Sequence, residues 1–134
     1  MKITNGKILI FFGITHPLLG VSPLAFGKQF AGFGEKFFFK ISEGLLEFPL
    51  LNGQMNYENF AAFWFFYFGV LLIPLGILVD YTENTVGAIP KKFLVAYLIV
   101  VLVGVFMIPF SGMTLLMLPH ALYMLYEQKG SPMK

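Results

Sequence analysis

Two histidines, each next to a proline, are the residues of this chain whose types point most directly to chemistry. His16 precedes Pro17 in the first long apolar run, and His120 follows Pro119 in the last. Since proline has no backbone N–H, each one leaves the carbonyl four residues earlier without its helical hydrogen bond. A free carbonyl beside an imidazole can hold a proton donor, a water molecule or a polar ligand group where backbone lines a cavity. The sequence therefore predicts two polar positions inside apolar helices.

Three roles are open for these histidines. An ionisable group within lipid is costly and usually faces a bundle interior or a water-filled cavity, which indicates a ligand or proton site. A histidine can also simply bond two helices together, which contributes ~0.6 to 2 kcal/mol. A metal or haem pair is the third role, although zinc takes three or four ligands and no other cue supports two axial haem ligands. We therefore expect no metal and no cofactor, with haem kept as the remaining option.

An aromatic run, residues 61–68, adds a surface on which a flat apolar ligand can stack, although an aromatic belt at a membrane interface explains it equally well. The predicted ligand-binding set joins the histidines to nearby polar and aromatic residues: His16, His120, Thr15, Trp64, Tyr67 and Tyr123. No catalytic residue is assigned. The sequence has no phosphate loop, no serine–histidine–acid set and no paired carboxylates within an apolar run, so hydrolase, ATPase and proton-pump functions lack support.

The composition is that of a membrane protein. Of 134 residues, 57% are hydrophobic and only 12% are charged, and 17 are phenylalanine. A soluble domain carries roughly a quarter charged residues. The absence of cysteine excludes disulfides and thiolate metal sites. All nine basic residues are dispersed lysines and the formal net charge is +2, so nothing indicates a nucleic-acid partner.

The elements that must position these residues are four predicted transmembrane helices in a single integral membrane domain, residues 1–134. A membrane helix needs ~20 residues, with 17–25 as the usual range. Short connections that contain Gly87 and Pro90, and then Pro109 and Gly112, predict an up-down bundle. The expected spans are about 4–24, 58–80, 91–109 and 111–127.

The first connection is long enough to have structure of its own. Phenylalanines and leucines recur there at three- and four-residue spacing, which predicts an amphipathic helix over about 28–48. Such a helix most simply lies in the membrane interface, and the alternative is a lid over an outward-facing cavity. Pro49 is expected to end it, and Asn52 and Gly53 to form a turn.

The lysines predict the orientation. Both termini and the second connection hold six of the nine lysines, which favours a cytoplasmic location for both ends of the chain. His16 then lies about 13–14 Å, and His120 roughly 10 Å, from that face, so one shared site is a hypothesis. The basic start of the first span also fits a cleaved signal peptide, but the histidine–proline pair within it favours a retained helix.

Five short stretches lie in the predicted helices and connections: Gly6–Leu9, Gly13–His16, Phe63–Phe65, Gly76–Asp80 and Ile108–Gly112. Together they resemble a family of small bacterial four-helix membrane proteins that is known only as a domain of unknown function. The resemblance covers nearly the whole chain and implies a bacterial inner-membrane protein, but no activity.

Three functions remain open from the sequence. The leading hypothesis is an integral membrane protein that binds a lipid or another apolar small molecule near His16 and His120. The second is a non-catalytic partner or assembly protein that acts through its helix faces, as part of a homo-oligomer or with another protein. The third is a small membrane isomerase or redox protein, in which the histidines move protons. We lean against an enzyme.

Overall fold

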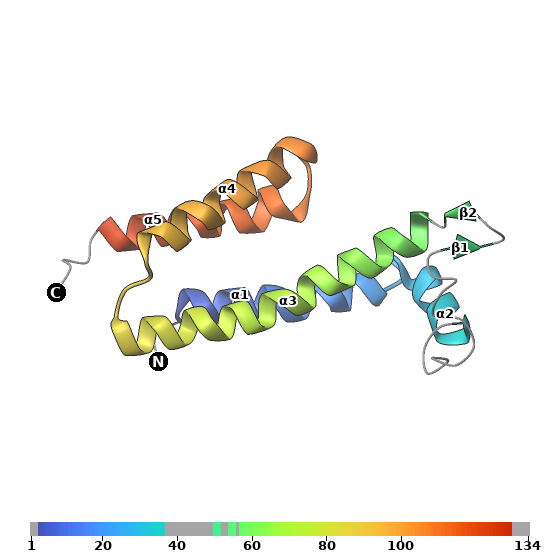
Figure 1. Ribbon diagram of the computed structural model, residues 1–134, viewed down its shortest axis with the longest axis horizontal. Coiled ribbons are helices and arrows are strands. Elements are labelled where there is room, and N and C mark those ends of the chain that lie inside the picture. The colour runs from blue at the N-terminus through green and yellow to red at the C-terminus, as the bar shows by residue number, and fades with distance from the viewer. Residues whose placement is uncertain (1–2, 37–49, 52–53, 56, 130–134) are drawn as a thin grey trace. The chain divides into compact units, whose positions relative to one another are not determined.

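The computed structural model describes residues 3–36, 50–51, 54–55 and 57–129. These residues are mostly helical, which confirms the predicted all-α class. They also include one short antiparallel pair, in which Leu50 pairs with Met55 and Leu51 with Gln54. The elements are α1 (Asn5–Val21), α2 (Gly27–Lys36), β1 (Leu50–Leu51), β2 (Gln54–Met55), α3 (Tyr57–Val86), α4 (Lys91–Met107), the π-helix η2 (Met113–Met117) and α5 (Leu118–Lys129) (Figure 1).

The helices lie in the predicted segments, but they begin and end at different residues. α3 continues past Asp80 to Val86, where Gly87 turns the chain with a φ of 77°. α2 covers the start of the expected amphipathic helix, and residues 37–48 lie outside the described residues, as does the Asn52–Gly53 turn. Among the described residues, α3 has the length and composition to cross a membrane, while α1 is apolar but has 17 residues.

The prolines are accommodated in different ways. Pro17 and Pro74 lie inside α1 and α3, which run through them as continuous helices. Pro119 is the second residue of α5, which begins directly after η2. A π-turn is a wider helical turn, found mostly where the regular hydrogen-bond ladder is interrupted. The missing N–H of Pro119 therefore coincides with an irregular backbone just before His120.

The chain divides into two compact units, one of residues 9–76 and one of residues 1–8 and 77–134. In the first unit, α1 and α3 approach each other at glycines. A Cβ on Gly13 would lie 2.9 Å from the backbone nitrogen of Ile73, and a Cβ on Gly69 would lie 2.4 Å from the ring of Pro17. The helices run antiparallel, since later residues of α1 meet earlier residues of α3. Small residues allow this backbone approach.

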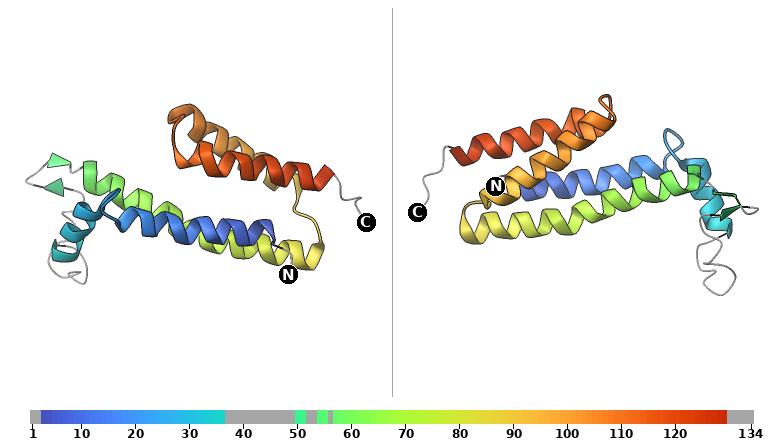
Figure 2. Two further views of the ribbon diagram at one scale, coloured as in Figure 1. Left: turned by 180° about the vertical axis from the view of Figure 1, so that it is seen from behind. Right: turned by 45° about the horizontal axis from the view of Figure 1, so that its top comes forward.

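The second unit is built on α4, η2 and α5, which lie side by side (Figure 2). Buried apolar side chains of these three elements include Leu94, Val101, Met117, Ala121 and Met124. The same unit contains the first turn of α1 and the last turns of α3, where a Cβ on Gly6 would lie 2.2 Å from the backbone nitrogen of Asp80. This close contact positions the polar groups described next.

Candidate functional site

The N-terminus of α1 is held by side chains from the C-terminal part of α3. Thr4 caps the helix, because its Oγ1 accepts a hydrogen bond from the backbone N–H of Lys7, and its hydroxyl donates to the Asp80 carboxylate. The Glu83 carboxylate accepts a hydrogen bond of 3.0 Å from the backbone N–H of Gly6. Free N–H groups and the positive end of the helix dipole favour anions at a helix N-terminus. The Glu83 carboxylate and the Thr4 hydroxyl therefore replace missing helical partners of α1, and Asp80 holds the Thr4 side chain in place.

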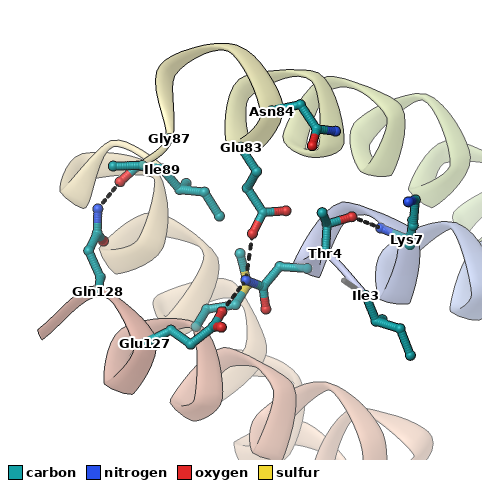
Figure 3. A pocket seen from close by; sticks show the side chains of 12 residues that line it. Ile3, Thr4, Lys7, Glu83, Asn84, Gly87, Ile89, Glu127 and Gln128 are labelled. Atoms are coloured by element: carbon teal, nitrogen blue, oxygen red, sulfur yellow. Dashed lines mark hydrogen bonds between the residues drawn. The ribbon is translucent and has the colours of Figure 1, made fainter. Parts of the chain in front are cut away.

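Asn5 lies at the centre of a network that joins three helices. Only 4% of its surface is exposed. Its amide nitrogen donates to Glu83 at 2.7 Å and to Glu127 of α5 at 2.9 Å (Figure 3). Two carboxylates cannot both face an amide oxygen, so this arrangement fixes the orientation of the Asn5 side chain. One amide group thus bonds to two residues that lie 78 and 122 positions later in the chain.

A pocket of about 360 Å³ opens beside this network. Its size is at the lower end of the range typical of small-molecule sites, ~300–1,000 Å³. We call it the Asn5 pocket. Glu83 and Glu127 both line it, and Figure 3 shows their side chains pointing toward one another. The lining residues are Ile3, Thr4, Asn5, Lys7, Glu83, Asn84, Gly87, Ala88, Ile89, Met124, Glu127 and Gln128.

Two side-chain oxygens in this lining are buried without a hydrogen-bond partner. One is Oδ1 of Asn5, which points away from the two carboxylates that fix its amide nitrogen. The other is Oε1 of Gln128, whose Nε2 donates to the backbone carbonyl of Ile89. A buried polar atom without a partner costs ~1–3 kcal/mol. Both of these unsatisfied acceptors belong to residues that line the pocket.

His120 belongs to the same unit and lies next to this network. It is 5% exposed, and its Nδ1 lies 3.2 Å from the hydroxyl of Tyr97, with the two rings edge to face at 5.9 Å. The backbone of Asn5 lies beside the imidazole, and Glu83 is near enough for its charge to act on it. The predicted polar position at His120 thus connects α4 and α5 to the Asn5 network.

His16 belongs to the other unit and has aromatic neighbours. Its ring stacks on Phe65 with centroids 3.9 Å apart and meets Phe68 edge to face at 5.7 Å. Its Nδ1 is buried without a hydrogen-bond partner, next to Gly69. These contacts are those of a packed helix pair. The hypothesis that His16 and His120 share one site stays a prediction.

The other predicted ligand-binding residues have separate environments. The Thr15 hydroxyl donates to the Phe11 carbonyl of its own helix at 2.9 Å. Trp64 and Tyr67 lie on the surface of α3, 51% and 42% exposed, and contact each other edge to face at 6.2 Å. Tyr123 is 46% exposed on α5. Among the described residues, no group of three or more His, Cys, Asp or Glu side chains is placed to hold a metal ion.

Sequence reasoning missed the Asn5 network because its members look ordinary one by one. Asn5 follows a charged terminus, while Glu83 and Glu127 lie near helix ends, where charges are common. The signal that could have found them is positional. All three lie at helix ends that the lysine distribution assigns to one face of the predicted bundle.

The fold and the pocket define a small all-α protein with a polar pocket where the ends of three helices meet. The chain belongs to a family described as a family of unknown function (DUF6463), whose model matches residues 1–130. This confirms the expected membership of a family of unknown function. No curated protein and no solved structure matches the chain.

Proposed function

We propose that this protein is a bacterial inner-membrane protein with four spans that binds a small polar molecule in the Asn5 pocket. The observation that carries the binding role is the Asn5 side chain, which is almost fully buried while its Oδ1 has no partner. A protein that used this network only to join helices would gain nothing from a pocket beside an unsatisfied oxygen.

The membrane role is supported by the apolar surface of the helices. A core helix of a soluble protein is mostly buried, whereas only 28% of the most apolar window of α3 is buried. α4 likewise exposes large apolar side chains on the face opposite its buried residues: Val95, Ile99, Val100, Leu102, Val103 and Phe106. The helices α1 and α4 have 17 residues each, and η2 with α5 covers 113–129, so each reaches the lower limit of ~17–25 residues for a span.

The Asn5 network also supports the proposed topology. It bonds the first turn of α1 to the last turns of α3 and α5. In an up-down bundle of four spans, these three ends lie on the same side of the membrane, the side with more lysines and hence the cytoplasm.

Introduced cysteines test this topology, because the natural chain has none. We expect Lys28→Cys in α2 to react with a membrane-impermeant maleimide in intact spheroplasts. Lys91→Cys, at the start of α4, should react only after the membrane is permeabilised. Labelling of both variants from outside would overturn the four-span topology, and recovery of the chain in the soluble fraction after alkaline carbonate extraction would overturn the membrane role.

The binding role is tested by native mass spectrometry of the purified full chain. We expect wild type to carry a bound small molecule that Asn5→Ala has lost. Gln29→Ala is the matched control, since this side chain bonds to exposed Glu58 and does not line the pocket. If Asn5→Ala remains folded and carries every species that wild type and Gln29→Ala carry, the pocket is not a binding site.

This proposal differs from the apolar ligand expected from the sequence. The lining of the Asn5 pocket contains two carboxylates, one lysine and, in addition to Asn5, two amide side chains. A lipid chain would leave these groups unpaired, which is unfavourable. His120 keeps a part in the proposed site as a neighbour of Asn5, and His16 is proposed as a helix-packing residue.

A further inference from the structure

We infer that the molecule bound in the Asn5 pocket is a protonated amine, with its ammonium group among Asn5, Glu83 and Glu127 and a short apolar body beyond it. The inference rests on the proposed binding function of the pocket and names the chemical class of its ligand.

The first argument is the balance of hydrogen-bond donors and acceptors. The Asn5 amide nitrogen is committed to two carboxylates, and the Gln128 amide nitrogen to the Ile89 carbonyl. The buried side-chain atoms of the lining that have no partner are both acceptors, namely Oδ1 of Asn5 and Oε1 of Gln128. An ammonium group has three donors and no acceptor, so it complements this lining, whereas a carboxylate or phosphate ligand would add acceptors to acceptors.

The second argument is charge. Among the lining residues, Glu83 and Glu127 oppose the single positive side chain of Lys7, which leaves a formal charge of −1. Glu83 lies in the last turn of α3, which ends at Val86, and Glu127 in the last turn of α5, which ends at Lys129. The C-terminus of a helix carries a partial negative charge that disfavours carboxylates. A cation between them relieves both effects.

The third argument is the apolar part of the lining. Ile89 and Met124 are buried, at 8% and 2% exposure, and Ile3 and Ala88 also belong to the lining. A bare metal ion has no use for such a wall. A few methylene groups would bury apolar surface against it, at ~25 cal/mol per Å².

The test uses three probes with the same four-carbon chain: n-butylammonium chloride, n-butanol and sodium butyrate. Each is titrated into the purified full chain in detergent micelles at neutral pH, where a primary amine is protonated. The readouts are isothermal titration calorimetry and the ¹⁵N shift of the Asn5 side-chain amide. We expect n-butylammonium to bind and to move the Asn5 resonance, with the other two probes at least tenfold weaker.

Charge-removing variants locate the binding. Glu83→Gln keeps the size and one acceptor oxygen of the side chain but loses its charge, and we expect it to weaken n-butylammonium binding by about 10- to 100-fold. Glu127→Gln is the second variant, in case Glu83→Gln does not fold. Glu58→Gln is the matched control in the same helix as Glu83, and its affinity should equal that of wild type.

The outcomes separate this inference from the function on which it rests. If butanol or butyrate binds as well as the amine and Asn5→Ala abolishes that binding, the pocket is a binding site but its ligand is not an amine. If no probe moves the Asn5 resonance, an amine ligand is excluded. Whether the pocket binds another molecule is then decided by native mass spectrometry of wild type and Asn5→Ala. Equal losses in Glu83→Gln and Glu58→Gln would also overturn the inference.

Discussion

Gly6→Ala tests whether the close contact between α1 and α3 creates the Asn5 network. An alanine Cβ at this position would lie 2.2 Å from the backbone nitrogen of Asp80, whereas ordinary contact begins at 3.4 Å. The two backbones would have to separate by more than ~1 Å, because the atom in the way belongs to the main chain and not to a mobile side chain.

The magnitude follows from the bonds that this separation breaks. The Gly6 N–H and the Asn5 amide both donate to Glu83, at 3.0 and 2.7 Å. Hydrogen bonds to charged groups contribute ~1.5–3 kcal/mol each, while replacing a helical glycine by alanine gains only ~1 kcal/mol. We therefore expect Gly6→Ala to lower the free energy of unfolding by about 2–5 kcal/mol.

The assay is denaturant unfolding in micelles, followed by fluorescence of Trp64, the single tryptophan of the chain. Gly32→Ala in α2 is the control, since nothing lies within 4 Å of its new Cβ. That variant should be as stable as wild type or slightly more stable. Gly20→Ala should fall between them, because its Cβ meets only the Phe65 ring, 2.9 Å away. A Gly6→Ala protein as stable as Gly32→Ala would refute the reasoning.

Three further predictions concern single side chains. Asn5→Ala removes the amide that donates to both Glu83 and Glu127. We expect the free energy of unfolding to fall by ~2–4 kcal/mol in the same assay. An unchanged unfolding midpoint would show that the network does not contribute to stability. Tyr97→Phe deletes the hydroxyl beside His120 and should cost ~1 kcal/mol, with hydrogen exchange of the α5 amides accelerated; unaltered exchange would contradict it. His16→Phe keeps an aromatic ring against Phe65 and removes the unpartnered Nδ1, so stability and n-butylammonium affinity should stay at their wild-type values, and a fall in affinity would place His16 in the binding site.

The sequence predicts the helices of this chain well because their signals are local. The run from Phe60 to Val79 contains no charge, and Gly87, Pro90 and Pro109 mark the connections. Helix ends were less accurate: α3 extends to Val86 through polar residues that hydrophobicity alone excludes. Thr82, for example, stays helical with its hydroxyl bonded to the Leu78 carbonyl of the preceding turn.

The site was only partly within reach of the sequence. His120 was singled out as a costly intramembrane group, and it lies beside the Asn5 network. Asn5 itself has no local signal, because its role depends on partners 78 and 122 residues away. The spacing of Gly6, Gly13 and Gly20 at intervals of seven is visible in the sequence, but only the structure shows that each one meets a residue of α3.

The order of synthesis gives the Asn5 network a consequence for biogenesis. Asn5 leaves the ribosome before Glu83, which follows after most of α3, and Glu127 comes later still. Domains and their contacts form as the chain emerges, from the N-terminus onward. Until α5 has been synthesised, Asn5 has only one of its two carboxylate partners. A chain truncated before α5 would therefore keep a buried amide with an unused N–H, a defect by which quality-control proteases could distinguish an unfinished chain from a complete one.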